Sequence, residues 1–164
     1  MIPGLVRRLA RFFGLLVVSW VAMTTTHEVG HLLGGWIGGA TLKDFDLMPW
    51  RLPHSLHQPD PHPLLTLWAG PIFGIAAPIA IAFVCRWQPA TFVADFCLLA
   101  NGLYLALAWM TGDRFLDTAR LLDAGTPPWL LATFCGVTIC AGYIRFRTNC
   151  TTVLSKRDAV RASR

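Results

Sequence analysis

The sequence predicts an all-α membrane protein with about four transmembrane helices and a short re-entrant or hairpin loop after the first helix. Of its 164 residues, 54% are hydrophobic and only 14% are charged, whereas about a quarter of the residues in an average soluble domain are charged. The mean hydropathy is +0.51. So few charges cannot coat a water-soluble globule, and the length suits a single domain covering residues 1–164.

Four apolar segments are long enough to cross a bilayer, which takes roughly 20 mostly apolar residues. We expect spans at residues 12–40, 63–85, 96–112 and 124–144. The N-terminus resembles a signal sequence, but its apolar run continues into a polar motif, so we expect an uncleaved first transmembrane segment. An even number of spans places both ends of the chain on the same side of the membrane.

The net charge of +5 is concentrated at the two ends of the chain. The basic residues there are Arg7, Arg8 and Arg11, and then Arg145, Arg147, Lys156, Arg157, Arg161 and Arg164. Under the positive-inside rule, residues 1–11 and 145–164 are expected to be cytoplasmic flanks of a multi-pass protein of the cell (inner) membrane. The bilayer is then the first partner, and nucleic-acid binding is not expected. Five cysteines without a CxxC pair predict neither a disulfide framework nor a thiolate zinc site.

Two connecting regions hold most of the remaining polar residues. Residues 41–62 contain four prolines, and residues 41–47 alternate weakly in polarity, which favours a short strand or a re-entrant hairpin. The histidines of this region, His54, His57 and His62, invite a second metal site. Their spacing defines no ligand geometry, so we favour a plain polar loop over a second metal site. The functional interpretation of this loop is a substrate gate or an edge strand that pairs with an extended peptide.

The first apolar segment contains His27-Glu28-Val29-Gly30-His31, an HExxH pattern. Two histidines four residues apart lie on one helix face and can bind one zinc ion. The adjacent Glu28 can then take a proton from a zinc-bound water as general base. A charged residue inside an apolar span costs roughly 2.5–3.5 kcal/mol, so such residues usually mark function. The alternative is that this triplet only hydrogen-bonds other helices, and the glycines around it are expected to allow close helix packing.

A hydrolytic zinc site needs a third protein ligand and an open position for water. Residues 111–123 offer three candidates, Asp113, Asp117 and Asp123. Asp113 directly follows an expected helix break at Thr111-Gly112 and lies one turn from Asp117. Asp123 is more simply explained as an interfacial charge.

These motifs together resemble those of the site-2 proteases, the intramembrane zinc metallopeptidases. Residues 26–34 resemble the metal-binding helix of that family. Ala69-Gly70-Pro71 resembles its second signature, although Gly74 stands where the family has asparagine. The run from Leu116 to Leu122 resembles the third signature, without its glycine after the aspartate, and Asn101 is a candidate for its upstream asparagine.

The resemblance implies an intramembrane metallopeptidase domain with His27, His31 and Asp117 as zinc ligands and Glu28 as the catalytic base. Asp113 remains the alternative third ligand. Zn²⁺ would be the cofactor, and the substrates would be membrane-embedded or membrane-associated peptides or proteins. The competing hypothesis is a catalytically silent or non-peptidase zinc-binding membrane protein. No particular oligomeric state is predicted.

Overall fold

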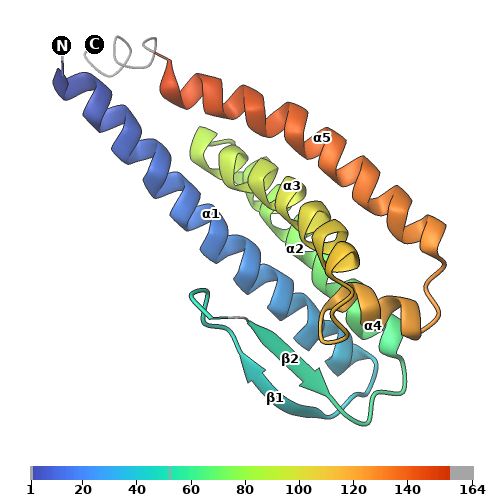
Figure 1. Ribbon diagram of the computed structural model, residues 1–164. Helices are drawn as coiled ribbons and strands as arrows, with labels where there is room; N and C mark the ends of the chain where they lie inside the picture. The colour runs from blue at the N-terminus through green and yellow to red at the C-terminus, as the bar shows by residue number, and fades with distance from the viewer. Residues whose placement is uncertain (1, 52, 156–164) are drawn as a thin grey trace.

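The computed structural model describes residues 2–51 and 53–155, which form five helices and a two-stranded hairpin (Figure 1). In chain order these elements are α1 (Ile2–Ile37), β1 (Leu42–Asp46), β2 (His54–His57), α2 (Pro63–Cys85), α3 (Gln88–Thr111), α4 (Asp117–Asp123) and α5 (Pro128–Leu154). By length and composition, α1, α2, α3 and α5 can each cross a membrane. The predicted fold class is therefore confirmed: an all-α membrane protein with about four transmembrane helices and a hairpin after the first.

The ends of the helices differ from the predicted spans more than their number does. The second span was predicted at the observed bounds of α2, but α1 already begins at Ile2 and α3 at Gln88. At the other end of the chain, α5 continues through Arg145 and Arg147. The remainder of the predicted basic flank, with Lys156, Arg157, Arg161 and Arg164, lies outside the described residues.

Asp95 explains why α3 and α5 extend beyond their apolar windows. It lies two turns into α3 and is buried, with only 2% of its surface exposed. Its Oδ1 accepts a hydrogen bond from Nε of Arg145 at 2.7 Å, and its Oδ2 accepts one from Nδ2 of Asn149 at 2.6 Å. Pairing with a cation and an amide compensates the burial of the carboxylate. Asp95 therefore lies inside α3, although the predicted third span begins only at residue 96.

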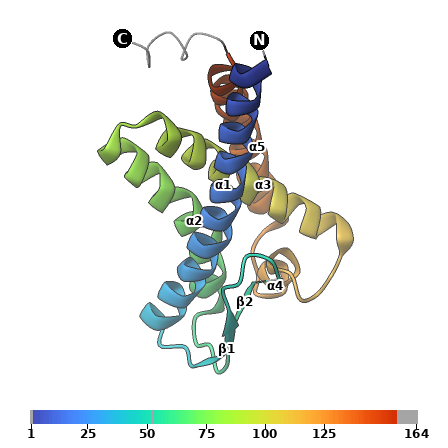
Figure 2. The ribbon, with the colours of Figure 1, turned by 90° about the vertical axis from the view of Figure 1, so that its left-hand side faces the viewer.

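Helix α1 packs mainly against α2, and α3 against α5, while α1 also contacts α3 (Figure 2). Small residues allow the closest of these approaches. A Cβ atom built at Gly34 would lie 2.5 Å from Cβ of Ala69, and one built at Gly30 would lie 2.8 Å from Cα of Gly70. The expectation that glycines around the HExxH pattern serve close helix packing is confirmed at these two positions.

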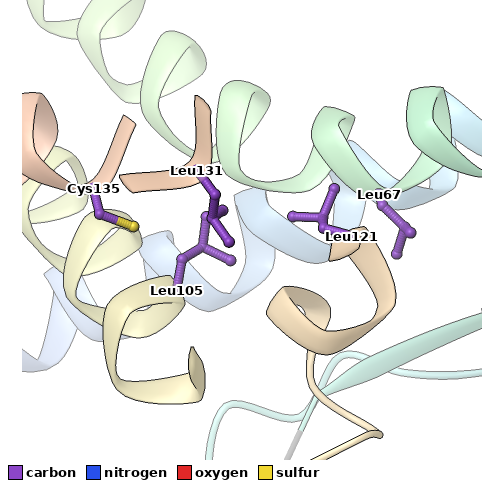
Figure 3. Packing of buried hydrophobic residues seen from close by; sticks show 5 residues of the cluster. All are labelled: Leu67, Leu105, Leu121, Leu131 and Cys135. Atoms are coloured by element: carbon purple, nitrogen blue, oxygen red, sulfur yellow. The ribbon is translucent and has the colours of Figure 1, made fainter. Parts of the chain in front are cut away.

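A small apolar core ties α4 to three of the long helices (Figure 3). Its buried members are Leu67 of α2, Leu105 of α3, Leu121 of α4, and Leu131 and Cys135 of α5. Because Leu121 is fully buried in this cluster, α4 is held beneath the bundle rather than left free on its surface. This matters for the site because Asp117 is the first residue of α4.

The hairpin and α4 lie together at one end of the bundle, opposite the end where α1 begins and α5 finishes (Figures 1 and 2). Strands β1 and β2 are antiparallel, with Phe45 paired to Ser55. Along β2 the side chains alternate, so that Ser55 and His57 are buried while Leu56 is exposed. The buried face of β2 therefore looks toward α1, which it contacts.

Candidate metal centre

Helix α1 brings the two histidines of the HExxH pattern together inside the protein. His27 and His31 lie one turn apart and are 3% and 4% exposed. Their Nε2 atoms are only 3.1 Å apart. This is the arrangement expected for residues four apart on one helix face, and both Nε2 atoms point to one small volume.

The other ring nitrogen of each histidine is bound to an acceptor. Nδ1 of His31 lies 2.8 Å from the backbone carbonyl oxygen of Thr66 in α2. Nδ1 of His27 lies 2.7 Å from Oδ1 of Asn101 in α3. A carbonyl oxygen only accepts, so each Nδ1 must carry the proton and donate. In the neutral rings, each Nε2 is then left with a free lone pair.

Asp117 supplies the third atom at this point. Its Oδ2 lies 2.8 Å from Nε2 of His27 and 3.2 Å from Nε2 of His31. Burial by itself raises the pKa of Asp117, but when the histidines carry a proton on Nε2 their positive charge and hydrogen bonds outweigh that effect and hold the pKa well below its usual value. Asp117 therefore stays ionised, which is the form that a metal ligand requires.

Three features of the chain carry Asp117 back to the depth of the histidines. Gly112 ends α3 in the left-handed region, with φ of 64°, a conformation that glycine adopts without strain. Oγ1 of Thr118 donates a hydrogen bond of 2.7 Å to the backbone carbonyl of Leu105, which ties α4 to α3. Leu121 anchors the rest of α4 in the core. The predicted helix break at Thr111-Gly112 is confirmed.

The residues present fit a zinc ion. Two neutral imidazole Nε2 atoms and a carboxylate oxygen would repel one another unless a cation or protons lie between them. Ligands about 2.0–2.1 Å from a tetrahedral zinc are about 3.3 Å from each other. The three observed separations, 2.8, 3.1 and 3.2 Å, are close to that value. Nitrogen and oxygen donors of this kind are also those that catalytic zinc sites use.

The other candidate aspartates lie elsewhere. Asp113 is exposed, and its Oδ1 accepts a hydrogen bond of 2.9 Å from the backbone N–H of Phe115. Asp123 is exposed at the end of α4. Asp117 also has a cation nearby, since Nη1 of Arg120 lies 3.9 Å from its Oδ1.

Glu28 stands beside the histidines without being drawn into the same contact. Ligand-capable atoms of His27, Glu28 and His31 all lie within 4.8 Å of one another. Oε2 of Glu28 accepts a hydrogen bond of 3.0 Å from Oγ of Ser55 on β2. A carboxylate within 4.8 Å of the two histidine nitrogens can bind a water that is also held at the metal position. This is the placement that a general base needs.

Two cavities reach Glu28. One, of about 420 Å³, is lined by Glu28, His31, Ser55, Tyr104, Asp117 and Arg120 among others. The second, of about 130 Å³, is also lined by Trp20, Met23 and Arg51. Glu28 and Tyr104 line both cavities. The site is therefore buried in the protein but borders two cavities.

The histidines of the hairpin region go to different places. His57 is buried against α1, where a Cβ atom built at Gly35 would lie 2.5 Å from its ring. Burial lowers the pKa of His57, so it stays neutral. Nε2 of His54 lies 3.3 Å from Oδ2 of Asp44 on the exposed face of the hairpin, and His62 precedes α2. Among the described residues these three form no metal-binding group.

Several residues at the site were not predicted for their roles. Ser55 and Thr66 contact Glu28 and His31, and the ring of Tyr104 lies edge-on to that of His27 with centroids 5.3 Å apart. For Asn101 the sequence predicts only a place in the third signature. One signal was present, since Asn101 and Tyr104 are polar residues three apart in an apolar span and so share a helix face.

Comparison of the chain with models of known protein families finds no match, and comparisons with curated proteins and with solved structures find none either.

Proposed function

We propose that this protein is an intramembrane zinc metalloprotease, similar to the site-2 proteases, that hydrolyses peptide bonds of membrane-embedded or membrane-associated substrates. The observation that carries the proposal is the convergence of His27, His31 and Asp117, with Glu28 beside them, inside a bundle of four apolar helices. Ionisable groups buried at such depth are costly and mark function.

In this proposal His27, His31 and Asp117 hold the zinc ion, which when bound acts as a Lewis acid toward the attacking water and the peptide carbonyl. Glu28 takes one proton from the water as its oxygen adds to the carbonyl carbon. The same carboxyl group then gives the proton to the leaving nitrogen as the carbon–nitrogen bond breaks. The products are one carboxylic acid and one amine, so no further reactant is needed.

The structure supports Asp117 rather than Asp113 as the third ligand. Only Asp117 contacts both histidines, whereas Asp113 is exposed and caps its own turn.

The basic residues near the two ends of the chain support a location in the cell (inner) membrane with both termini in the cytoplasm. Arg7, Arg11 and Arg147 belong to the ends of α1 and α5 that lie together (Figure 1).

Replacing Glu28 tests the proposal. The Glu28→Gln protein should keep its zinc and lose hydrolysis of a model transmembrane peptide by at least 100-fold, because an amide cannot accept the proton and general-base catalysis contributes about 10²–10⁴-fold. Asp123→Asn makes the same chemical change at an exposed carboxylate and should cleave like the original protein. Zinc content and cleavage are measured in the same detergent preparation. If the original protein binds zinc but cleaves no peptide, the catalytically silent zinc-binding protein is the correct alternative.

A further inference from the structure

Asn101 is a polar residue in an apolar span, and it is completely buried, with 0% of its surface exposed. Both the oxygen and the nitrogen of its carboxamide have a hydrogen-bond partner. Oδ1 lies 2.7 Å from Nδ1 of His27, and Nδ2 donates a hydrogen bond of 2.9 Å to the backbone carbonyl of Cys97, one turn earlier in α3.

These two contacts fix which end of the amide faces the histidine. If the carboxamide were turned over, Oδ1 would face the carbonyl oxygen of Cys97, and two acceptors would meet without a hydrogen between them. The oxygen must therefore face His27, whose Nδ1 must carry the proton. As a result, the Nε2 lone pair of His27 is directed at His31 and Asp117, from which it lies 3.1 and 2.8 Å.

The carboxamide is also held in place by packing. Gly74 of α2 faces it, and a Cβ atom built there would lie 2.8 Å from Oδ1 and 3.0 Å from Nδ2 of Asn101. Position 74 is therefore glycine because the space that a side chain would fill is taken by the amide from α3. The next residue of α3, Gly102, packs closely against Thr138 of α5, because a Cβ atom built there would meet Oγ1 of Thr138. This packing limits movement of the turn that carries Asn101.

We propose that Asn101 is the positioning residue of the metal centre, which fixes the tautomer and the ring orientation of His27 from α3 so that Nε2 is presented for zinc. This inference rests on the proposed function, because the ion that His27 would bind is the zinc of the protease. Carbonyl or carboxylate partners on the second nitrogen of a ligating histidine typically change metal affinity by about 10–100-fold.

Zinc affinity measured by competition with a chelating dye, on the full chain in detergent, tests the proposal without any cleavage assay. Asn101→Ala should weaken zinc binding by about 10–100-fold. Asn101→Asp should recover most of that loss, because a carboxylate also accepts from Nδ1 of His27. Asn149→Ala is the matched control: it removes an amide that contacts buried Asp95, so it should lower the melting temperature and leave zinc affinity unchanged.

Glycine substitutions test the packing step in the same way. Gly74→Ala should weaken zinc binding because it displaces the carboxamide, while Gly136→Ala, where a Cβ atom meets nothing within 4 Å, should not. Nitrogen NMR of labelled histidine in the zinc-loaded original protein provides a measurement that needs no variant. It should find the proton of His27 on Nδ1.

Several results would overturn the inference. It is wrong if Asn101→Ala binds zinc like the original protein, if Asn149→Ala weakens zinc as much, or if the proton of His27 is on Nε2. Neither binding result would touch cleavage, so an active protease would keep its proposed function. Failure of the original protein to bind zinc at all would instead overturn the proposed function and this inference with it.

Discussion

Asp117 is the residue whose role depends most on tertiary structure, because it lies 90 positions from His27 and yet 2.8 Å from its ring. The HExxH pattern could be recognised from sequence since its geometry is local: four residues make one turn of helix. The acceptors that orient the histidines could not, because Thr66 and Asn101 lie 35 and 74 positions from their partners. Those contacts exist only once α2 and α3 have packed against α1.

Gly74 shows how a departure from a signature can be explained after the fold is known. The resembled signature has asparagine at this position, and the sequence alone offers no reason for a glycine here. In the structure the space beside Gly74 is filled by the carboxamide of Asn101. The carboxamide next to His27 therefore comes from α3.

The third ligand leads to a prediction at the residue scale. Asp117→Ala should weaken zinc binding by more than the roughly 100-fold that loss of an outer partner can cost, because it removes one of the three proposed protein ligands. Asp113→Ala changes the same residue type four positions earlier, at an exposed site, and should leave the affinity unchanged. Zinc titration of the two variants side by side decides between them. A large loss in Asp113→Ala with normal binding in Asp117→Ala would reverse the assignment.

At the scale of elements, the apolar segments predicted the four long helices, but polar pairing decided where those helices end. The predicted third span begins at residue 96, directly after Asp95, whereas α3 begins at Gln88. In the folded chain that carboxylate is paired with Arg145 and Asn149, so α3 and α5 both continue through it. An average of hydropathy over a sequence window counts each charged residue separately. It cannot detect that two opposite charges on different helices neutralise each other.

The contact between α1 and α2 gives a prediction for one glycine. A Cβ atom built at Gly70 would overlap the ring of His31, so Gly70→Ala must push this ring out of its place. We expect Gly70→Ala to reduce both zinc affinity and peptide cleavage, although alanine is the better helix former by about 1 kcal/mol. Gly136→Ala, on the open face of α5, should instead keep zinc and melt at the same or a higher temperature. Unchanged zinc binding in Gly70→Ala would contradict the observed packing of α2 on His31.

At the scale of the whole molecule, the two ends of the bundle differ in chemistry. The end where α1 begins and α5 finishes carries Arg7, Arg8 and Arg11 together with Arg147, and Arg86 follows α2 there. The opposite end carries the hairpin and α4 (Figure 1). The hairpin is fastened to the bundle by a hydrogen bond of 2.8 Å from Nε1 of Trp20 to the backbone carbonyl of Pro49, and by Ser55 on Glu28.

This polarity predicts the topology of the protein in its membrane. The basic end should face the cytoplasm under the positive-inside rule, which places the hairpin on the outer side. Reporter fusions at the two termini should both give the cytoplasmic signal.

Thiol labelling tests the side on which the hairpin lies. In intact cells, a membrane-impermeant thiol reagent should label Trp50→Cys in the exposed hairpin turn of a variant without the native cysteines. The same reagent should miss Arg86→Cys at the basic end until the cells are opened. Labelling of position 86 alone in intact cells would invert the orientation, and since the histidines lie on the hairpin half of α1, it would also move the site to the cytoplasmic side of the bilayer.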